Sequence, residues 1–134
     1  MKEQRYRLRL GDKIAGYLRR IHGTDFYSPD GFWWTGRSLN YTQVDESVEM
    51  RDRNRTRLYE WDIARFKPNA DQDEELGVFL WNKQQERWIL RSIDTEIDYH
   101  LNVNGIDLFN GSDLLLESHV FLNPDLQRAW GLQE

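Results

Sequence analysis

No cysteine occurs among the 134 residues, which excludes disulfide bonds, thiolate metal ligands and cysteine nucleophiles. Histidine is also scarce. His22, His100 and His119 lie far apart in the sequence, and none has a second ligand at the two-to-four-residue spacing that zinc sites use. The sequence therefore predicts no metal ion and no other cofactor.

Long apolar runs are missing as well. The chain starts with Met1-Lys2-Glu3-Gln4-Arg5, which lacks the apolar stretch of a secretory signal, and no segment approaches the ~20 apolar residues of a membrane span. Without cysteine, nothing points to an oxidising compartment. We expect a soluble cytoplasmic protein that does not associate with a membrane.

The usual catalytic signatures are missing too. The sequence contains no Gly-x-Ser-x-Gly nucleophile elbow and no glycine-rich turn of the kind that binds phosphates or dinucleotides. The 23 acidic residues make chance pairs of carboxylates inevitable, so such pairs carry no catalytic information. We expect no catalytic residues and a protein that is not an enzyme.

Aromatic residues are plentiful. Six Phe, six Tyr and six Trp are enough to fill one hydrophobic core, and the length suits one domain over residues 1–134. Charge is distributed unevenly along the chain, because residues 1–67 carry a net charge of +4 and residues 68–134 carry −9. Such asymmetry marks either a basic binding face or an ordinary solvated surface.

Alternation of polar and apolar residues over 5–10 predicts a half-buried strand. Gly11-Asp12 suits the two-residue turn of a II′ hairpin, with residues 13–21 as the return strand. A helix over the same stretch, capped by Asp12, remains an alternative.

Further short strands are predicted by apolar runs between turn signals. They are expected at 32–35, around 44–50, and at 58–66, 76–81, 87–93, 99–103, 107–109, 114–116 and 119–122. Pro29-Asp30-Gly31 and Asn104-Gly105 are turn signals, and residues 51–57 form a polar loop or hairpin tip. Asn123 as N-cap and Pro124 at the first helical position predict a short C-terminal helix. The fold class is therefore mainly β, with closely spaced strands typical of a small barrel.

One group of residues has the composition of a nucleic-acid site. Arginines alternate at Arg51, Arg53, Arg55 and Arg57 and would share one face of an extended chain. Arg5, Arg7 and Arg9 alternate in the same way, on what would be the solvent face of a strand. Trp33 and Trp34 could stack on bases, as aromatic residues of small barrels do with single strands. The net charge of −5 opposes this hypothesis because it weakens attraction to phosphate.

Two stretches resemble a known family. Asp52-Arg53-Asn54 and the following Leu58-Tyr59-Glu60-Trp61-Asp62-Ile63 resemble the Asp-Lys-Asn-Gly-Lys-x-Ile-Tyr-Glu-Gly-Asp-Ile stretch of the YopX family of phage and prophage proteins. Near the C-terminus, residues 119–126, with Asn123-Pro124, resemble that family's Gly-Asn-Ile-Tyr-Glu-Asn-Pro-Glu-Leu ending.

The chain departs from the family pattern at three glycines. Arg55 and Trp61 replace two of them, and Val48-Glu49 stands where the family often has Thr-Gly. Because side chains disfavour positive φ, we expect Asn54 or a longer loop to take any such position at the tip, and we expect Trp61 to avoid it. Asp62, together with Asp52 and Tyr59, is expected to be structural, with its carboxylate accepting backbone N–H groups at a turn.

The resemblance implies that residues 58–134 form an SH3-like small barrel followed by the terminal helix. Residues 1–57 would form a β-rich region ahead of it. It implies a phage or prophage origin and no particular chemistry. Our leading hypothesis is a non-enzymatic interaction module that binds a protein partner or itself. The alternative is a nucleic-acid-binding protein that uses residues 51–57 and nearby aromatic residues.

Overall fold

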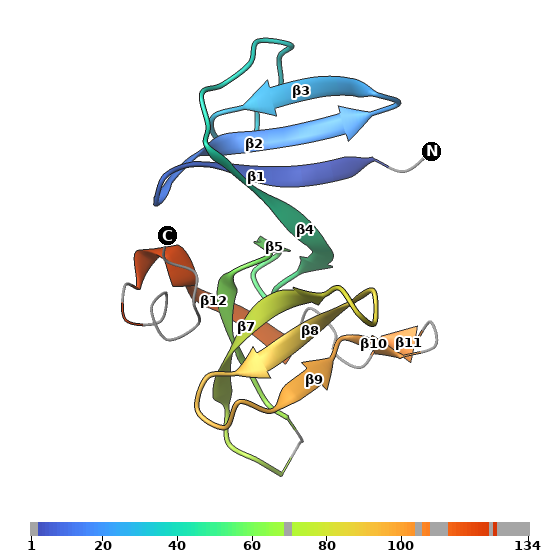
Figure 1. The fold of residues 1–134 in the computed structure, drawn as a ribbon, viewed down its shortest axis with the longest axis vertical. Helices are drawn as coiled ribbons and strands as arrows, with labels where there is room; N and C mark the ends of the chain where they lie inside the picture. Colours follow the sequence, from blue (N-terminus) through green and yellow to red (C-terminus); the bar gives the residue numbers. More distant parts are fainter. Residues whose placement is uncertain (1–2, 69–70, 104–105, 108–112, 124, 126–134) are drawn as a thin grey trace. The chain divides into compact units, whose positions relative to one another are not determined.

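The computed structural model describes residues 3–68, 71–103, 106–107, 113–123 and 125. The described chain is mainly β, as predicted, and consists of two five-stranded antiparallel sheets and a two-stranded ribbon (Figure 1). Pro124, the predicted C-terminal helix apart from Asp125, and the Asn104-Gly105 turn lie outside the described residues. No helix within the described part of the chain is long and apolar enough to cross a membrane.

The chain divides into two compact units, Met1–Ser47 and Val48–Glu134. The sequence suggested a boundary at 57/58 instead. The difference arises at strand β4 (Gln43–Arg51), whose first residues pair with β1, whereas its other neighbour in the sheet, β5 (Arg57–Tyr59), belongs to the second unit.

The first unit is built on a β-hairpin. Strands β1 (Gln4–Leu10) and β2 (Lys13–Ile21) pair in antiparallel register, and β3 (Thr24–Ser28) continues the sheet. Leu10 pairs with Lys13 across the turn, with φ = +64° at Gly11. The hairpin alternative is therefore confirmed, and residues 13–21 are a strand rather than a helix.

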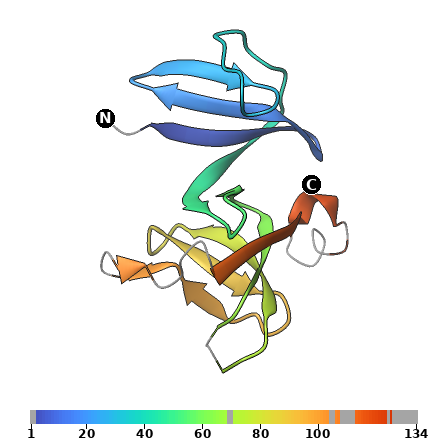
Figure 2. The ribbon, with the colours of Figure 1, turned by 180° about the vertical axis from the view of Figure 1, so that it is seen from behind.

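In the part of the chain that the structure describes, the second unit also holds the remaining strands and the 3₁₀ helix η2. These are β6 (Asp62–Phe66), β7 (Glu75–Asn82), β8 (Arg87–Ser92), β9 (Asp98–His100), β10 (Asn102–Val103), β11 (Ile106–Asp107), β12 (Leu114–His119) and η2 (Val120–Leu122). The main sheet has the order β12-β6-β7-β8-β9, so the last strand returns beside the first. Figure 2, the view from behind, shows β12 on the near side of this unit and the β7–β8 hairpin beyond it. The hairpin predicted from residues 76–93 is confirmed.

Three predicted strands need correction. Residues 32–35 form no strand, and only Thr35 makes an isolated bridge, to Tyr27. The strand predicted over 58–66 is interrupted by a turn at Glu60-Trp61, and 119–122 is mostly the 3₁₀ helix η2. In each case local hydrogen bonds, described below, turn the backbone away from the extended path that the apolar residues indicated.

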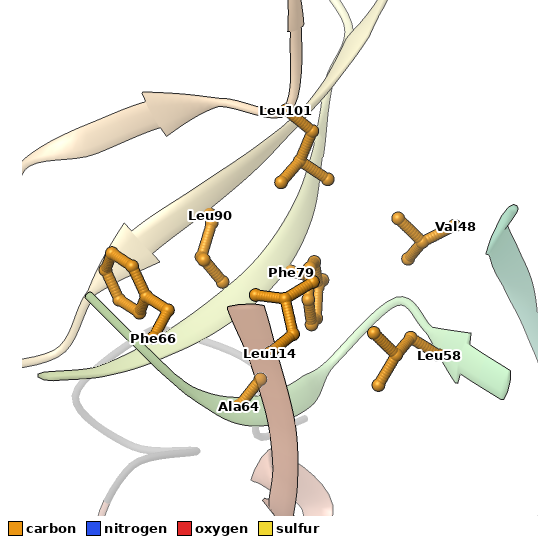
Figure 3. Packing of buried hydrophobic residues seen from close by; sticks show 8 residues of the cluster. All are labelled: Val48, Leu58, Ala64, Phe66, Phe79, Leu90, Leu101 and Leu114. Carbon is orange, nitrogen blue, oxygen red and sulfur yellow. The ribbon is translucent and has the colours of Figure 1, made fainter. Parts of the chain in front are cut away.

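Among the described residues, the second unit has two hydrophobic clusters; the smaller consists of Ile63, Val78 and Val120, and the larger is made of aliphatic and phenylalanine side chains from several strands. The buried members of the larger cluster are Val48, Leu58, Ala64, Phe66, Phe79, Leu90, Leu101 and Leu114 (Figure 3). Tryptophan contributes only at the margins, because no described tryptophan belongs to the buried set. The expectation that the aromatic residues would fill the core is thus met by Phe and Tyr and not by Trp.

Gly16 is required by a close backbone approach in the first unit. A Cβ atom there would lie 2.5 Å from the carbonyl oxygen of Ser28 and 2.5 Å from Leu39 Cδ1, at φ = +156°. We expect Gly16→Ala to lower the free energy of unfolding by about 2–3 kcal/mol, because the backbone oxygen cannot move aside cheaply. Gly36→Ala is the matched control, since a Cβ there meets nothing within 4 Å. Equal stability of the two variants in urea denaturation would contradict this account.

Candidate interaction surfaces

The six residues proposed from the sequence as a nucleic-acid site lie in two loops. Trp33 and Trp34 belong to residues 29–37 of the first unit, here called the aromatic loop. The four arginines belong to residues 51–57 of the second unit, here called the arginine loop. Because the loops belong to different units, each is described as a surface of its own.

Side-chain oxygens hold the backbone of the aromatic loop. The buried hydroxyl of Ser28 accepts a hydrogen bond from the N–H of Gly31 (2.8 Å), and Asp30 Oδ1 accepts from the N–H groups of Phe32 (2.8 Å) and Trp33 (3.3 Å). This is an Asx turn, a local alternative to strand hydrogen bonds, and it explains why residues 32–35 are not a strand. The loop is consequently ordered at its tip.

Phe32 and Trp33 extend from this ordered tip into solvent. Phe32 is 82% exposed and Trp33 is 78% exposed. Two large aromatic side chains at successive positions are thus open to solvent, and contiguous exposed apolar surface marks interaction sites more often than scattered single side chains do. The sequence-based hypothesis listed Trp33 but not Phe32 among the site residues. The polar turn Pro29-Asp30-Gly31 directly before the pair was the signal that could have indicated exposure of both.

Trp34 has a different environment from Trp33. The guanidinium of Arg19 lies 5.1 Å from the centroid of the Trp34 ring, and that of Arg5 lies 6.0 Å away. Glu3 forms ion pairs with both arginines. Trp34 is half-buried among cation–π contacts, so Phe32 and Trp33 form the accessible part of the loop.

The alternating arginines of β1 are not a solvated row. Arg7 and Arg9 are buried, and their guanidinium groups converge on Asp45 of β4, which is 1% exposed. Arg7 Nε lies 2.9 Å from Asp45 Oδ2, and Arg9 forms a bidentate pair at 2.8 and 2.9 Å. The sequence placed these arginines on a solvent face, and that prediction was wrong because the neighbouring strand supplies a buried carboxylate.

Asp52 organises the arginine loop. Its Oδ1 accepts hydrogen bonds from the N–H groups of Asn54 (2.9 Å) and Thr56 (2.8 Å), and its Oδ2 accepts from the N–H of Leu116 in β12 (2.9 Å). The N–H of Arg53 also donates to the carbonyl of Leu114 (2.9 Å). The loop is therefore fixed both internally and to β12, in agreement with the structural role expected for Asp52.

The arginines themselves face solvent. Arg51, Arg53 and Arg55 are exposed and Arg57 is half-buried. Among the described residues, the only ion pair that these four make joins Arg53 Nη2 to Glu74 Oε2, at 3.9 Å. Arg51 ends β4 and Arg57 begins β5, so a guanidinium stands at each end of the turn as well as within it.

The three positions at which the resemblance has glycine all adopt positive φ. The values are +66° at Glu49, +65° at Arg55 and +72° at Trp61. We expected Asn54 or a longer loop to take the positive φ at the tip and Trp61 to avoid it; both expectations were wrong, because Arg55 and Trp61 adopt it themselves. The N–H of Arg55 donates to the carbonyl of Asp52 (2.9 Å). The N–H of Trp61 donates to the carbonyl of Phe79 (3.0 Å), and the carbonyl of Trp61 accepts from the N–H of Val120 (2.9 Å). These hydrogen bonds hold both residues in place.

Asp62 is fully buried and uses both carboxylate oxygens. Oδ2 accepts from the N–H of Tyr59 (2.8 Å), and Oδ1 lies 2.6 Å from His119 Nδ1. The imidazole of His119 stacks on Phe121, with ring centroids 5.0 Å apart. The structural role predicted for Asp62 is thus met by the Tyr59 N–H, whereas its partner His119 was not foreseen.

Asn123 follows η2 as its C-cap, and the predicted helix after it lies outside the described residues except for Asp125. The side-chain amide of Asn123 donates to the carbonyl of His119 (2.6 Å) and to Ser118 Oγ (3.1 Å), so this group is turned back toward β12. No cluster of three or more potential metal ligands occurs within the described residues.

No family model matches the chain, and neither a curated protein nor a solved structure does.

Arg55 provides a direct test of the backbone strain. A non-glycine residue in the left-handed region costs roughly 1–2 kcal/mol, and Arg55 is exposed, so its side chain contributes little packing. We expect Arg55→Gly to raise the free energy of unfolding by about 0.5–1 kcal/mol after the added entropy of the unfolded chain is considered. Arg53→Gly, at a position without positive φ, should lower it. If urea denaturation showed that both variants are destabilised, the conclusion that the backbone of Arg55 is strained would be wrong.

Asp30 gives the aromatic loop a pH dependence. Hydrogen bonds from the N–H groups of Phe32 and then Trp33 hold the pKa of the Asp30 carboxyl below its ordinary 3.8. Because the folded-state pKa is lowered, the loop contacts are fully formed above pH 3.8 and are lost as the pH falls through the folded-state value. In an NMR titration, the amide protons of Phe32 and Trp33 should share a midpoint below 3.8 that disappears in Asp30→Asn. A midpoint at or above 3.8 would contradict the assignment.

Proposed function

We propose that the protein is a non-enzymatic interaction module that binds a protein partner through the aromatic loop. The observation that carries this proposal is the exposure of Phe32 (82%) and Trp33 (78%) on a backbone fixed by Ser28 and Asp30. The partner would offer an apolar pocket or groove to these two side chains.

Energetics favour this use of the loop. Large aromatic side chains supply much of the binding energy at protein interfaces, with truncation costs of about 2 kcal/mol or more at the best-packed positions. Ordering a loop during binding opposes affinity, and here the turn is already held by hydrogen bonds before any partner arrives. The flanking Trp34, fixed between Arg5 and Arg19, would limit movement of the loop base.

The wider assignment is a YopX-like protein of a phage or prophage that acts in the cytoplasm. Two observations support it. The positive φ values of Glu49, Arg55 and Trp61 coincide with the three glycines of the resembled pattern, as expected if the backbone were shared and the side chains had changed. The carboxylates of Asp52 and Asp62, both present in that pattern, accept the backbone hydrogen bonds that define the two turns.

We also propose that residues 58–134 contain an SH3-like barrel portion. The antiparallel meander β6-β7-β8-β9, with the later strand β12 paired beside β6, supports this proposal. The core cluster with Leu114 of β12 against Ala64 and Phe79 gives the strands a common interior (Figure 3).

The test compares two double variants of exposed apolar residues. Phe32→Ser/Trp33→Ser removes the tip of the aromatic loop, and Leu10→Ser/Ile14→Ser removes two side chains that are 51% and 40% exposed elsewhere in the first unit. We expect the first variant to weaken binding of a purified partner at least tenfold, as interface aromatics do, and the second to bind normally. Self-association is followed in parallel by light scattering. Equal binding by the two variants, or a strictly monomeric protein that binds no partner, would refute the proposal.

A further inference from the structure

We propose that the arginine loop, residues 51–57, is a binding site for the phosphodiester backbone of nucleic acid. This site lies in the second unit and does not depend on the aromatic loop or on the function proposed for it. The argument rests on the geometry of the loop, on the ion pairing of its arginines and on the position of Glu74.

The loop is built to display guanidinium groups. Asp52 directs its carboxylate inward to three backbone N–H groups, which leaves the alternate positions Arg51, Arg53 and Arg55 exposed. Hydrogen bonds to Leu114 and Leu116 fix the turn against β12, so the guanidinium groups stand on a rigid support. Guanidinium groups are planar donors that match phosphate oxygens in a bidentate manner.

Several strand arginines elsewhere in the described chain have close carboxylate partners. Arg20, Arg65 and Arg91 each lie 2.6–2.7 Å from an acid, at Asp25, Glu117 and Asp98 respectively. The arginine loop differs, because its one described ion pair is the 3.9 Å contact of Arg53 with Glu74. Like charges held close together cost energy, and an anionic ligand would remove that cost.

A phosphodiester backbone fits this arrangement better than a single small anion. Four guanidinium groups within seven residues suit a ligand that repeats its charge at regular spacing. No exposed aromatic side chain occurs within the loop, so we expect contacts to phosphates rather than to bases, and binding that is independent of sequence.

Glu74 is positioned to oppose the ligand. Its carboxylate contacts Arg53, and it also acts on Arg65, whose pKa is raised mainly by the hydrogen bond to Glu117 and further by Glu74. Glu74 lies beside an acidic segment that includes Asp71 and Asp73. A phosphate that binds Arg53 would have to displace this carboxylate, so removing the charge of Glu74 should strengthen binding.

The experiment measures the affinity of the full chain for a fluorescent oligonucleotide, single-stranded and as a duplex, by anisotropy. If three or four phosphates are contacted, single-strand affinity should fall roughly 20- to 50-fold between 50 and 200 mM salt. Arg53→Gln/Arg55→Gln should weaken binding about tenfold at low salt and reduce the slope of log K against log salt by about 1.4. Glu74→Gln should raise affinity severalfold.

The matched control is Arg37→Gln/Lys83→Gln, which changes net charge by the same amount at two exposed positions outside the loop. It should retain near-normal affinity, because the proposed site is local. Absence of binding at low salt, or an equal loss in this control, would overturn the proposal. Polyglutamate that binds with the same dependence on Arg53 and Arg55 would also overturn it, in favour of an acidic protein partner. The Phe32/Trp33 variant should bind nucleic acid normally, which separates this site from the proposed protein-binding loop.

Discussion

The shape of the arginine loop in the second unit depends on the hydrogen bonds that the carboxylate of Asp52 accepts. A buried carboxylate is costly unless its oxygens accept hydrogen bonds, and Asp52 accepts three from backbone N–H groups. Two of these close the turn at Asn54 and Thr56, and the third reaches Leu116 in a strand more than sixty residues away. One side chain thus sets a local turn and its attachment to β12 together.

The same device recurs at the other turns of functional interest. Asp30 accepts hydrogen bonds from the N–H groups of Phe32 and Trp33. Asp62 accepts one from the N–H of Tyr59 and also pairs with the imidazole of His119. Each carboxylate replaces hydrogen bonds that a strand would have made. The chain can therefore keep large side chains at positions where turns usually carry small ones.

The sequence predicted those elements whose alternation and turn residues agreed. The β1–β2 and β7–β8 hairpins are examples, because apolar periodicity and turn signals indicated the same structure. The strand predicted at 32–35 failed because periodicity does not register a carboxylate two residues upstream that captures the backbone. The burial of Arg7 and Arg9 was equally invisible, since it requires Asp45 from a strand some 36 residues later to lie opposite them.

Backbone conformation marks another limit of sequence reasoning. Propensity alone argues against positive φ at Glu49, Arg55 and Trp61, and all three adopt it. Backbone hydrogen bonds of Arg55 and Trp61 hold these two residues in that conformation. Local strain of this kind persists only where neighbouring structure determines it, and a single sequence shows no sign of that.

Net charge per segment also proves less informative than the partners of individual charges. The first 67 residues carry a surplus of positive charge, which by itself is compatible with a basic binding face or with an ordinary solvated surface. In the structure, Asp45 neutralises charge on Arg7 and Arg9, and Glu3 and Asp25 lie against Arg19 and Arg20. When these ion pairs are set aside, the remaining positive charge is concentrated at residues 51–57. There the carboxylate of Asp52 accepts hydrogen bonds from the backbone, and the one described ion pair of the arginines is the 3.9 Å contact with Glu74. Because electrostatic attraction acts over about a Debye length, a local excess of this kind can bind an anion even though the whole chain is acidic.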